Sequence, residues 1–219
     1  MSKEKTIVVD NYGIDRKFAT IYIEGDSDLI LNKTNNAAIR TLTADDGKKQ
    51  RKWEQDHRNV WEQIITAIHW YDPIGFGIDE TNSICDEEMM HRLLKENTPC
   101  IPAFAFHKTL SDAVVRNGIE KNKTKIEDDN NIIVPRGFCK VEITEWSFEE
   151  LLMSPKSGSP VRVALNHFSG WRTSFGISYT ESVYTLDNMV NFFNLAGFGL
   201  GIGSGRTSGY GRYHVADVK

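Results

Sequence analysis

The stretch TLDNMVNFFNLAGFGLGIGSGRTSGYGRYHV, residues 185–215, decides the fold because it predicts a helix, a glycine-rich loop and a strand in direct succession. Thr185 is a side chain that commonly caps a helix, and Met189 and Phe193 stand at the spacing of one helix face. The glycines that follow end the helix. The β-forming residues within 210–217 then predict the last strand.

The rest of the chain completes an order of elements typical of one α+β fold. In chain order we expect a strand at 17–24, a helix at 103–116, strands at 134–144 and 171–180, a helix at 185–197 and a strand at 210–217. This βαββαβ order is that of a ferredoxin-like or RRM-like sandwich, in which two helices cover one antiparallel sheet. Residues 1–219 then form a single domain.

Two segments lie outside that core. Residues 26–99 form a large insertion after the first strand, and no linker sets them apart as a second domain. Residues 119–131 are polar and lack periodicity, which predicts a protruding loop. Residues 147–153, SFEELLM, are expected to form a short helical turn.

Composition limits the classes of function. The 219 residues are 40% hydrophobic and 26% charged, which is ordinary for a soluble globular protein, and no apolar run reaches the length of a membrane span. The polar start of the chain does not resemble a signal peptide, so we expect a cytoplasmic protein without membrane contact. The three cysteines show no metal-ligand spacing and are expected to be reduced, structural thiols. We expect no cofactor and no metal.

The net charge of −4 argues against a broad basic surface but leaves room for a local basic groove. One basic cluster stands out within GKKQRKW, formed by Lys48, Lys49, Arg51 and Lys52. This cluster either flanks the path of a bound nucleic-acid strand or is simply the solvent-exposed face of a loop.

Glycines in the loop before the last strand follow the pattern G-x-G-x5-G-x-G, at Gly201, Gly203, Gly209 and Gly211. The loop follows a helix and precedes a strand, so it is neither a dinucleotide fingerprint nor a Walker loop. Bare backbone of this kind can approach an anion such as a phosphate, and Arg206 and Arg212 would add charge-assisted hydrogen bonds. The alternative is a long turn packed closely on a helix.

A second segment, CIPAFAFHKTL at 100–110, makes the glycine pattern more specific. Together with IYIEGDSDLIL at 21–31 and the glycine-rich loop, it resembles the RAMP superfamily, the RNA-binding proteins of CRISPR systems, and most closely their backbone subunits. Ile101, Pro102, Phe106, Lys108 and Leu110 fall on that family's pattern. The chain departs from it at 103–105, where the family has Gly-Ser-Ser. Short chains of this kind also resemble proteins encoded by phages, so a stand-alone role and a place in a CRISPR complex both stay open.

The resemblance implies a ferredoxin-like core whose subunits stack side by side along one RNA strand, with an inserted thumb. Residues 119–131 or the insertion at 26–99 would supply the thumb. The implied function is binding of single-stranded nucleic acid, RNA in preference to DNA, by a self-associating subunit with little sequence specificity. The implied partners are therefore the strand itself and either further copies of this chain or subunits of a CRISPR-like complex.

The expected contacts to the strand are phosphate-binding cations and glycine backbone, with aromatic rings that stack on bases. The phosphate set comprises Lys108, Arg172, Gly201, Gly203, Arg206, Gly209, Gly211 and Arg212, with Lys48, Lys49, Arg51 and Lys52 beside it. The stacking candidates are Phe168, Trp171 and Tyr210. Each of these aromatics is equally explained as part of the core.

Two other functions stay open. Some RAMP proteins cut RNA without a metal, using a histidine or an aspartate on the loop after the first strand. The candidates here are His107 and His167 and the acidic residues Asp26, Asp28, Asp45 and Asp46. The chain could also mimic a CRISPR backbone subunit and so join or block its assembly.

Overall fold

The computed structural model describes residues 15–78, 84–153 and 160–219. The larger sheet has the order β10, β1, β9, β6, β4, β3, and β5 pairs with β9. Its strands are β1 (Arg16–Gly25), β3 (His69–Trp70), β4 (Pro99–Pro102), β5 (Ile132–Ile133), β6 (Phe138–Glu142), β9 (Arg172–Thr180) and β10 (Tyr213–Val218). Two helices pack against this sheet, α5 (Phe104–Arg116) and α7 (Leu186–Gly199).

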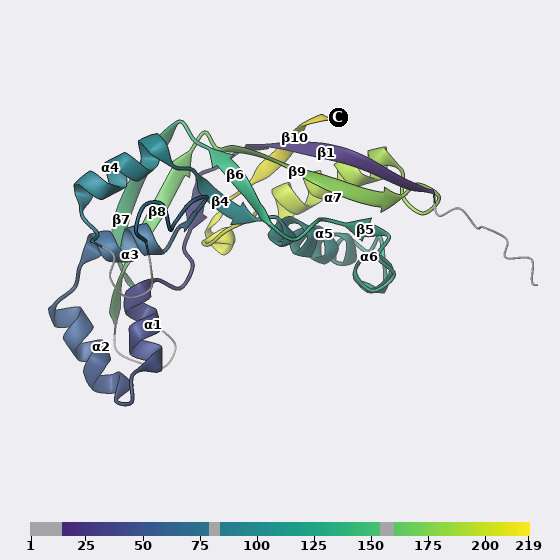
Figure 1. Ribbon diagram of the computed structural model, residues 1–219. Coiled ribbons are helices and arrows are strands. Elements are labelled where there is room, and N and C mark those ends of the chain that lie inside the picture. Colours follow the sequence, from purple (N-terminus) through teal and green to yellow (C-terminus); the bar gives the residue numbers. More distant parts are fainter. Residues whose placement is uncertain (1–14, 79–83, 154–159) are drawn as a thin grey trace, which may run out of the picture.

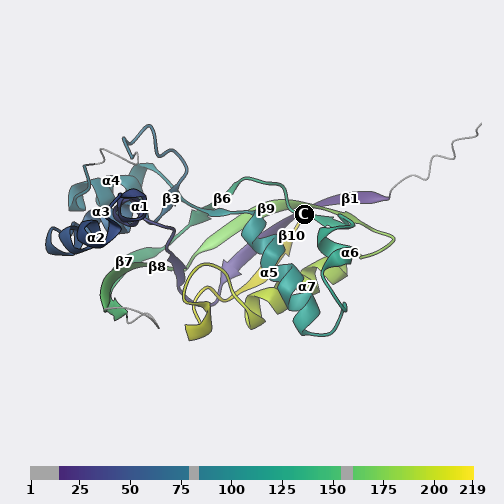
Figure 2. The ribbon, with the colours of Figure 1, turned by 90° about the horizontal axis from the view of Figure 1, so that it is seen from below.

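The core of this sheet has ferredoxin-like topology. In chain order the elements are β1, α5, β6, β9, α7 and β10, and the strands lie side by side as β10, β1, β9, β6, all antiparallel. Helices α5 and α7 pack together beneath one face, as Figure 1 and Figure 2 show. The expected α+β fold of βαββαβ order is confirmed.

Aromatic rings join the helices to the sheet. Phe106 of α5 stacks on Phe175 of β9 at 4.4 Å between ring centroids, and Phe193 of α7 meets Phe175 edge-on at 5.3 Å. Such pairs add stability beyond the apolar area that they bury. On β1, alternate residues such as Ile21 and Ile23 face these helices and are buried. The opposite face of the sheet carries no helix in the described part of the chain.

The predicted strand at 134–144 is wrong in its bounds, because only β6 lies within it and the separate strand β5 precedes it. Pro135 lies between β5 and β6 and has no backbone N–H to give to a neighbouring strand. Helix α7 begins as the sequence predicts. The Thr185 side chain accepts a hydrogen bond from the backbone N–H of Asn188, whose side chain accepts one from the N–H of Thr185 in return.

A smaller sheet lies beside the ferredoxin-like core, with the order β2 (Leu29–Leu31), β8 (Val161–Ser169) and β7 (Glu145–Met153). The helical turn expected at 147–153 is wrong, because these residues belong to β7. Every residue of β7 pairs with β8, and that long-range ladder decides the local conformation.

Within 26–99 the helices are α1 (Asn36–Thr43), α2 (Gly47–Asp56), α3 (Val60–Thr66) and α4 (Glu87–Glu96). They gather at the end of the molecule away from α5 and α7 (Figure 1). The Arg40 guanidinium on α1 joins them, since it bonds Glu54 of α2 at 3.1 Å and Glu62 of α3 at 2.6 Å. These two carboxylates raise the pKa of Arg40, which stays charged.

Residues 119–131 contain the short helix α6 (Thr124–Glu127) and lie against the core. Ile126 is fully buried, Lys123 pairs with Asp112 of α5, and the Tyr184 hydroxyl donates to Glu120 at 2.9 Å. Whether this segment, or the insertion at 26–99, acts as a thumb stays a prediction.

Candidate nucleic-acid interface

The glycine-rich loop between α7 and β10 needs glycine for conformation and for space. Gly201, Gly203, Gly209 and Gly211 have φ of 70°, 78°, 90° and 67°, and Gly205 has φ of 69°. A Cβ on Gly211 would lie 1.8 Å from the carbonyl oxygen of Ile202. Since side-chain-bearing residues rarely adopt this backbone conformation, the loop can form only with glycine at most of these positions.

The loop is hydrogen-bonded to the chain that leaves β1. The bonds are Asp26 N to Arg212 O (2.8 Å), Ser27 Oγ to Gly209 O (2.9 Å), Gly211 N to Asp28 O (2.8 Å) and Ser204 N to Ile30 O (2.9 Å). The segment 21–31 and the glycine-rich loop, two of the three segments that carry the family resemblance, are therefore in direct contact.

Lys108 and Arg206 lie on one groove with a volume of about 300 Å³, formed by β2 and the residues after it, α5 and the glycine-rich loop. Lys33 also lines this groove and carries a positive charge. Pro102 and Gly203 lie on the walls of the groove. No carboxylate side chain is among the described residues that line it. We call this the cationic groove.

His69 also lines the cationic groove. Burial and the nearby Lys33 ammonium lower the pKa of His69 below its usual value, so the imidazole is neutral at neutral pH. The permanent charge of the groove therefore comes from Lys33, Lys108 and Arg206.

Backbone N–H groups add unused donors at the rim of this groove. Within the described part of the chain, the N–H groups of Gly203, Gly205, Arg206 and Thr207 donate no hydrogen bond. Gly205 is left-handed (φ 69°, ψ 15°) and a right-handed 3-10 turn, Arg206–Ser208, follows it. Successive residues of left- and right-handed conformation are the kind of backbone that forms anion-binding concavities.

Arg212, the other arginine expected to bind phosphate, is used within the loop. Its guanidinium donates to the carbonyl of Phe198 at 2.8 Å and to that of Arg206 at 3.2 Å. Arg212 thus fixes the end of α7 to the loop. Arg206, by contrast, is exposed and lines the cationic groove.

The remaining expected cations lie elsewhere. The exposed side chains of Lys48, Lys49, Arg51 and Lys52 are on α2, which both Figure 1 and Figure 2 place far from the glycine-rich loop. Arg172 projects from β9 and pairs with Glu24 of β1 at 2.8 Å, which lowers the pKa of Glu24. The structure therefore does not bring these residues to the groove.

Two of the expected stacking residues are in the core. Phe168 and Trp171 are 0% exposed, so neither can present a ring face to a base, and this prediction is wrong. The Trp171 indole N–H donates to the Ser27 carbonyl at 2.8 Å, and its ring fills the space beside Gly25. Tyr210 is half-buried, with its ring edge-on to His167 at 5.3 Å.

The acid–base candidates fall into different surroundings. His107 is buried and its Nε2 bonds the Ile132 carbonyl at 3.0 Å; burial lowers its pKa. Asp45 is exposed in the turn between α1 and α2, next to Asp46. Both are therefore poorly placed for acid–base work in the groove.

His167 lies between two carboxylates. Its Nε2 is 2.9 Å from Glu149 Oε1, and its Nδ1 is 3.8 Å from Asp28 Oδ2. A second pair, which no sequence motif marks, joins His214 Nδ1 to Asp26 Oδ1 at 2.7 Å, and both side chains are half-exposed. Only its place on the last strand could have indicated that His214 lies beside the turn after β1. Lys33 and His69 were also missed, because no motif marks them.

Among the described residues no group of three or more histidine, cysteine, aspartate or glutamate side chains could hold a metal ion. Nor do these residues include a helix with the length and apolar character to cross a membrane. The three cysteines are free and buried.

No protein-family model matches the chain, and no curated protein matches it. Among solved structures it is similar to a chain of "Cryo-EM structure of the Type III-B Cmr-beta bound to cognate target RNA", with 12% identity and a TM-score of 0.47, over 94% of this chain and 60% of that chain. It is also similar to Cmr6 from Pyrococcus furiosus, with 13% identity and a TM-score of 0.36, over 93% of this chain and 99% of that one. At these values the function has to be argued from the chain's own residues.

Proposed function

We propose that this protein binds single-stranded nucleic acid, RNA in preference to DNA, along the cationic groove. The observation that carries the proposal is the convergence of two motifs about a hundred residues apart in sequence. The helix segment with Pro102 and Lys108 and the loop segment with Gly203 and Arg206 line one groove, and the described residues that line it include no carboxylate side chain.

The chemistry of the groove suits a phosphate backbone. Lys33, Lys108 and Arg206 supply positive charge, and the free N–H groups of the glycine-rich loop supply donors for phosphate oxygens. Contacts of this kind give affinity with little sequence specificity. The net charge of −4 is compatible with this function, because the positive potential is local to the groove. The resemblance to RAMP proteins supports the preference for RNA.

The test is fluorescence anisotropy with labelled RNA and DNA strands of about 20 nucleotides, titrated at several salt concentrations from about 50 to 200 mM. We expect Lys108→Ala and Arg206→Ala each to weaken binding to all sequences about equally. Each variant should also reduce the slope of log K against log[salt] by about 0.7, the value for one lost contact to a single strand.

Lys95→Ala is the matched control, because Lys95 is an exposed lysine on α4 that does not line the groove. It should leave both affinity and salt slope unchanged. Absence of binding to either strand at about 50 mM salt, or an equal effect of all three variants, would overturn the proposal.

Cleavage of RNA is a second candidate, favoured by the half-exposed pair of His214 and Asp26 at 2.7 Å. A histidine oriented by a carboxylate can take the proton from a 2′-hydroxyl or return one to the leaving oxygen. Incubation of labelled RNA with EDTA tests this idea. Cleavage by the wild type that is lost in His214→Ala but retained in His107→Ala would support it, and intact RNA in every case would exclude it.

Side-by-side association along a strand, and entry into a CRISPR-like complex as a partner or inhibitor, are further proposals. Sedimentation with and without RNA separates them. Strand-dependent assembly of this chain alone favours the first. Co-purification with CRISPR subunits in the absence of RNA binding favours the second.

A further inference from the structure

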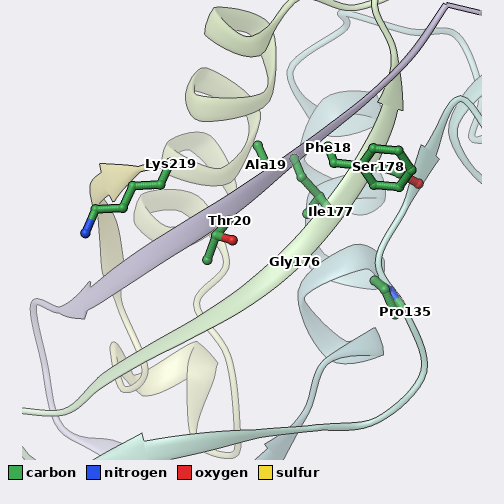
Figure 3. A pocket seen from close by; sticks show the side chains of 8 residues that line it. All are labelled: Phe18, Ala19, Thr20, Pro135, Gly176, Ile177, Ser178 and Lys219. Atoms are coloured by element: carbon green, nitrogen blue, oxygen red, sulfur yellow. The ribbon is translucent and has the colours of Figure 1, made fainter.

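The helix-free face of the larger sheet contains a hollow of about 370 Å³, shown in Figure 3. Phe18 and Thr20 come from β1, Gly176 and Ser178 from β9, and Lys219 lies at one side. We call this the sheet hollow. The cationic groove is lined by α5 and the glycine-rich loop instead, and the two share no lining residue.

Phe18, near the start of β1, is a large aromatic side chain that is 79% exposed on this face of the sheet. Its register partner across the strand pair is Ser178, and Figure 3 shows the ring lying over β9 beside that serine. Burial of such a ring would be favourable by a few kcal/mol, so leaving it in water is a cost that the fold itself does not explain.

The sheet surface next to the Phe18 ring is not covered by side chains at Gly176. Thr20 pairs with Gly176, and a Cβ added to Gly176 would find nothing within 4 Å. A glycine at a strand centre weakens a sheet and often marks close approach of a ligand. The Thr20 side chain lies across from this bare backbone, and its hydroxyl could bond the polar edge of a planar group, whereas Ser178 is 8% exposed.

The positive charge at the side of the hollow comes from Lys219, whose ammonium lies 3.9 Å from Asp217 Oδ2. Lys219 is the charged side chain among its lining residues, which include no carboxylate side chain in the described part of the chain. The Lys219 ammonium lies 5.0 Å from the centroid of the Tyr22 ring, on the same strand as Phe18. Because this ammonium is held beside Tyr22 and Asp217, the feature of the hollow that suits a single strand is the exposed Phe18 ring, on which a base can stack.

We propose that the sheet hollow binds a nucleobase of a single strand, stacked on the face of Phe18. This rests on the proposed function, and it assigns base contact to a different face from the phosphate contact. A protein partner fits less well. Protein interfaces bury about 800 Å² on each side, with several apolar anchors. Of the other apolar side chains that line the hollow, Pro135 is exposed, whereas Ala19 and Ile177 are 8% and 2% exposed.

The experiment compares two variants at one position, Phe18→Leu and Phe18→Trp, on the full-length chain. Leucine keeps an apolar side chain of similar size but has no ring face, whereas tryptophan keeps one. Each protein is titrated with an RNA of about 20 nucleotides and with an abasic strand of the same length. Because Phe18 is 79% exposed, both variants should melt at the wild-type temperature.

We expect Phe18→Leu to weaken binding of the RNA about five- to 150-fold, the range for one stacked base, with no change in salt slope. Phe18→Trp should bind as tightly as the wild type or more tightly. On the abasic strand all three proteins should bind equally. Equal losses on both strands, or an unchanged affinity for RNA in Phe18→Leu, would overturn the proposal, as would a self-association that Phe18→Leu abolishes.

The two proposals fail in different ways. Binding that depends on Phe18 but not on Lys108 or Arg206 would overturn the role of the cationic groove and leave the sheet hollow in place. Binding that depends on Lys108 and Arg206 but not on Phe18 would overturn the sheet hollow as a base-binding site and leave the cationic groove in place. Absence of any binding would overturn both.

Discussion

Replacement of Gly211 by alanine should be among the most damaging single changes in the glycine-rich loop. Gly211 has φ of +67°, a conformation that costs a residue with a side chain about 1 kcal/mol. The new Cβ would also lie 1.8 Å from the Ile202 carbonyl oxygen, so the backbone must move. That movement breaks the bonds from Ile202 N to Gly211 O (2.9 Å) and from Gly211 N to Asp28 O (2.8 Å), each contributing about 1 kcal/mol. The expected loss of unfolding free energy is about 3 kcal/mol.

Gly209→Ala is the matched control. Gly209 has an even larger φ of +90°, but a Cβ there would meet nothing within 4 Å. Its expected loss is therefore the conformational part alone, about 1 kcal/mol. Urea unfolding followed by tryptophan fluorescence measures both values. If the two variants lose the same stability, close backbone packing is not what the glycine at 211 provides, and the reasoning from contact distances is wrong.

Three further predictions concern stability and the buried thiols. Thr185→Ala removes the side chain that caps α7 and should cost about 1 kcal/mol in urea unfolding, whereas Thr185→Ser should keep most of it. Burial lowers the pKa of His107 in the folded state, so its contribution to stability is present above the unfolded pKa of about 6.5 and is lost as pH falls through the folded pKa. Urea midpoints measured from pH 8 to 5 should fall less for His107→Gln, and parallel curves would contradict this assignment. Burial raises the pKa of Cys100 to about 11, so a thiol reagent should label the native protein much more slowly than the unfolded chain; equal rates would contradict burial of the thiol.

The ferredoxin-like core could be predicted because its elements carry local signals. Alternation in β1, the capping threonine of α7 and the glycines before β10 each act within a few residues. The smaller sheet could not be predicted in this way. Residues 147–153 form a strand because they pair with β8, and a single sequence does not show which distant strand will be the partner.

The candidate site was predicted only in part for a similar reason. The glycine-rich loop and Lys108 carry motifs, and the structure places both on the cationic groove. For the aromatic residues, residue type alone could not separate the buried Trp171 from the exposed Phe18, because both occur in strand-like segments. Lys33 reaches the groove through the path of the insertion, which no local pattern encodes.

The hydrogen bonds between the turn after β1 and the glycine-rich loop also have a consequence for biosynthesis. Ser27 bonds residues that are 182 and 185 positions further along the chain. Contacts of such long sequence separation form late in folding. A nascent chain that has not yet been synthesised past Arg212 therefore holds Lys33 and Lys108 but has no closed groove. The proposed binding of nucleic acid could therefore begin only after the glycine-rich loop has left the ribosome and paired with the turn after β1.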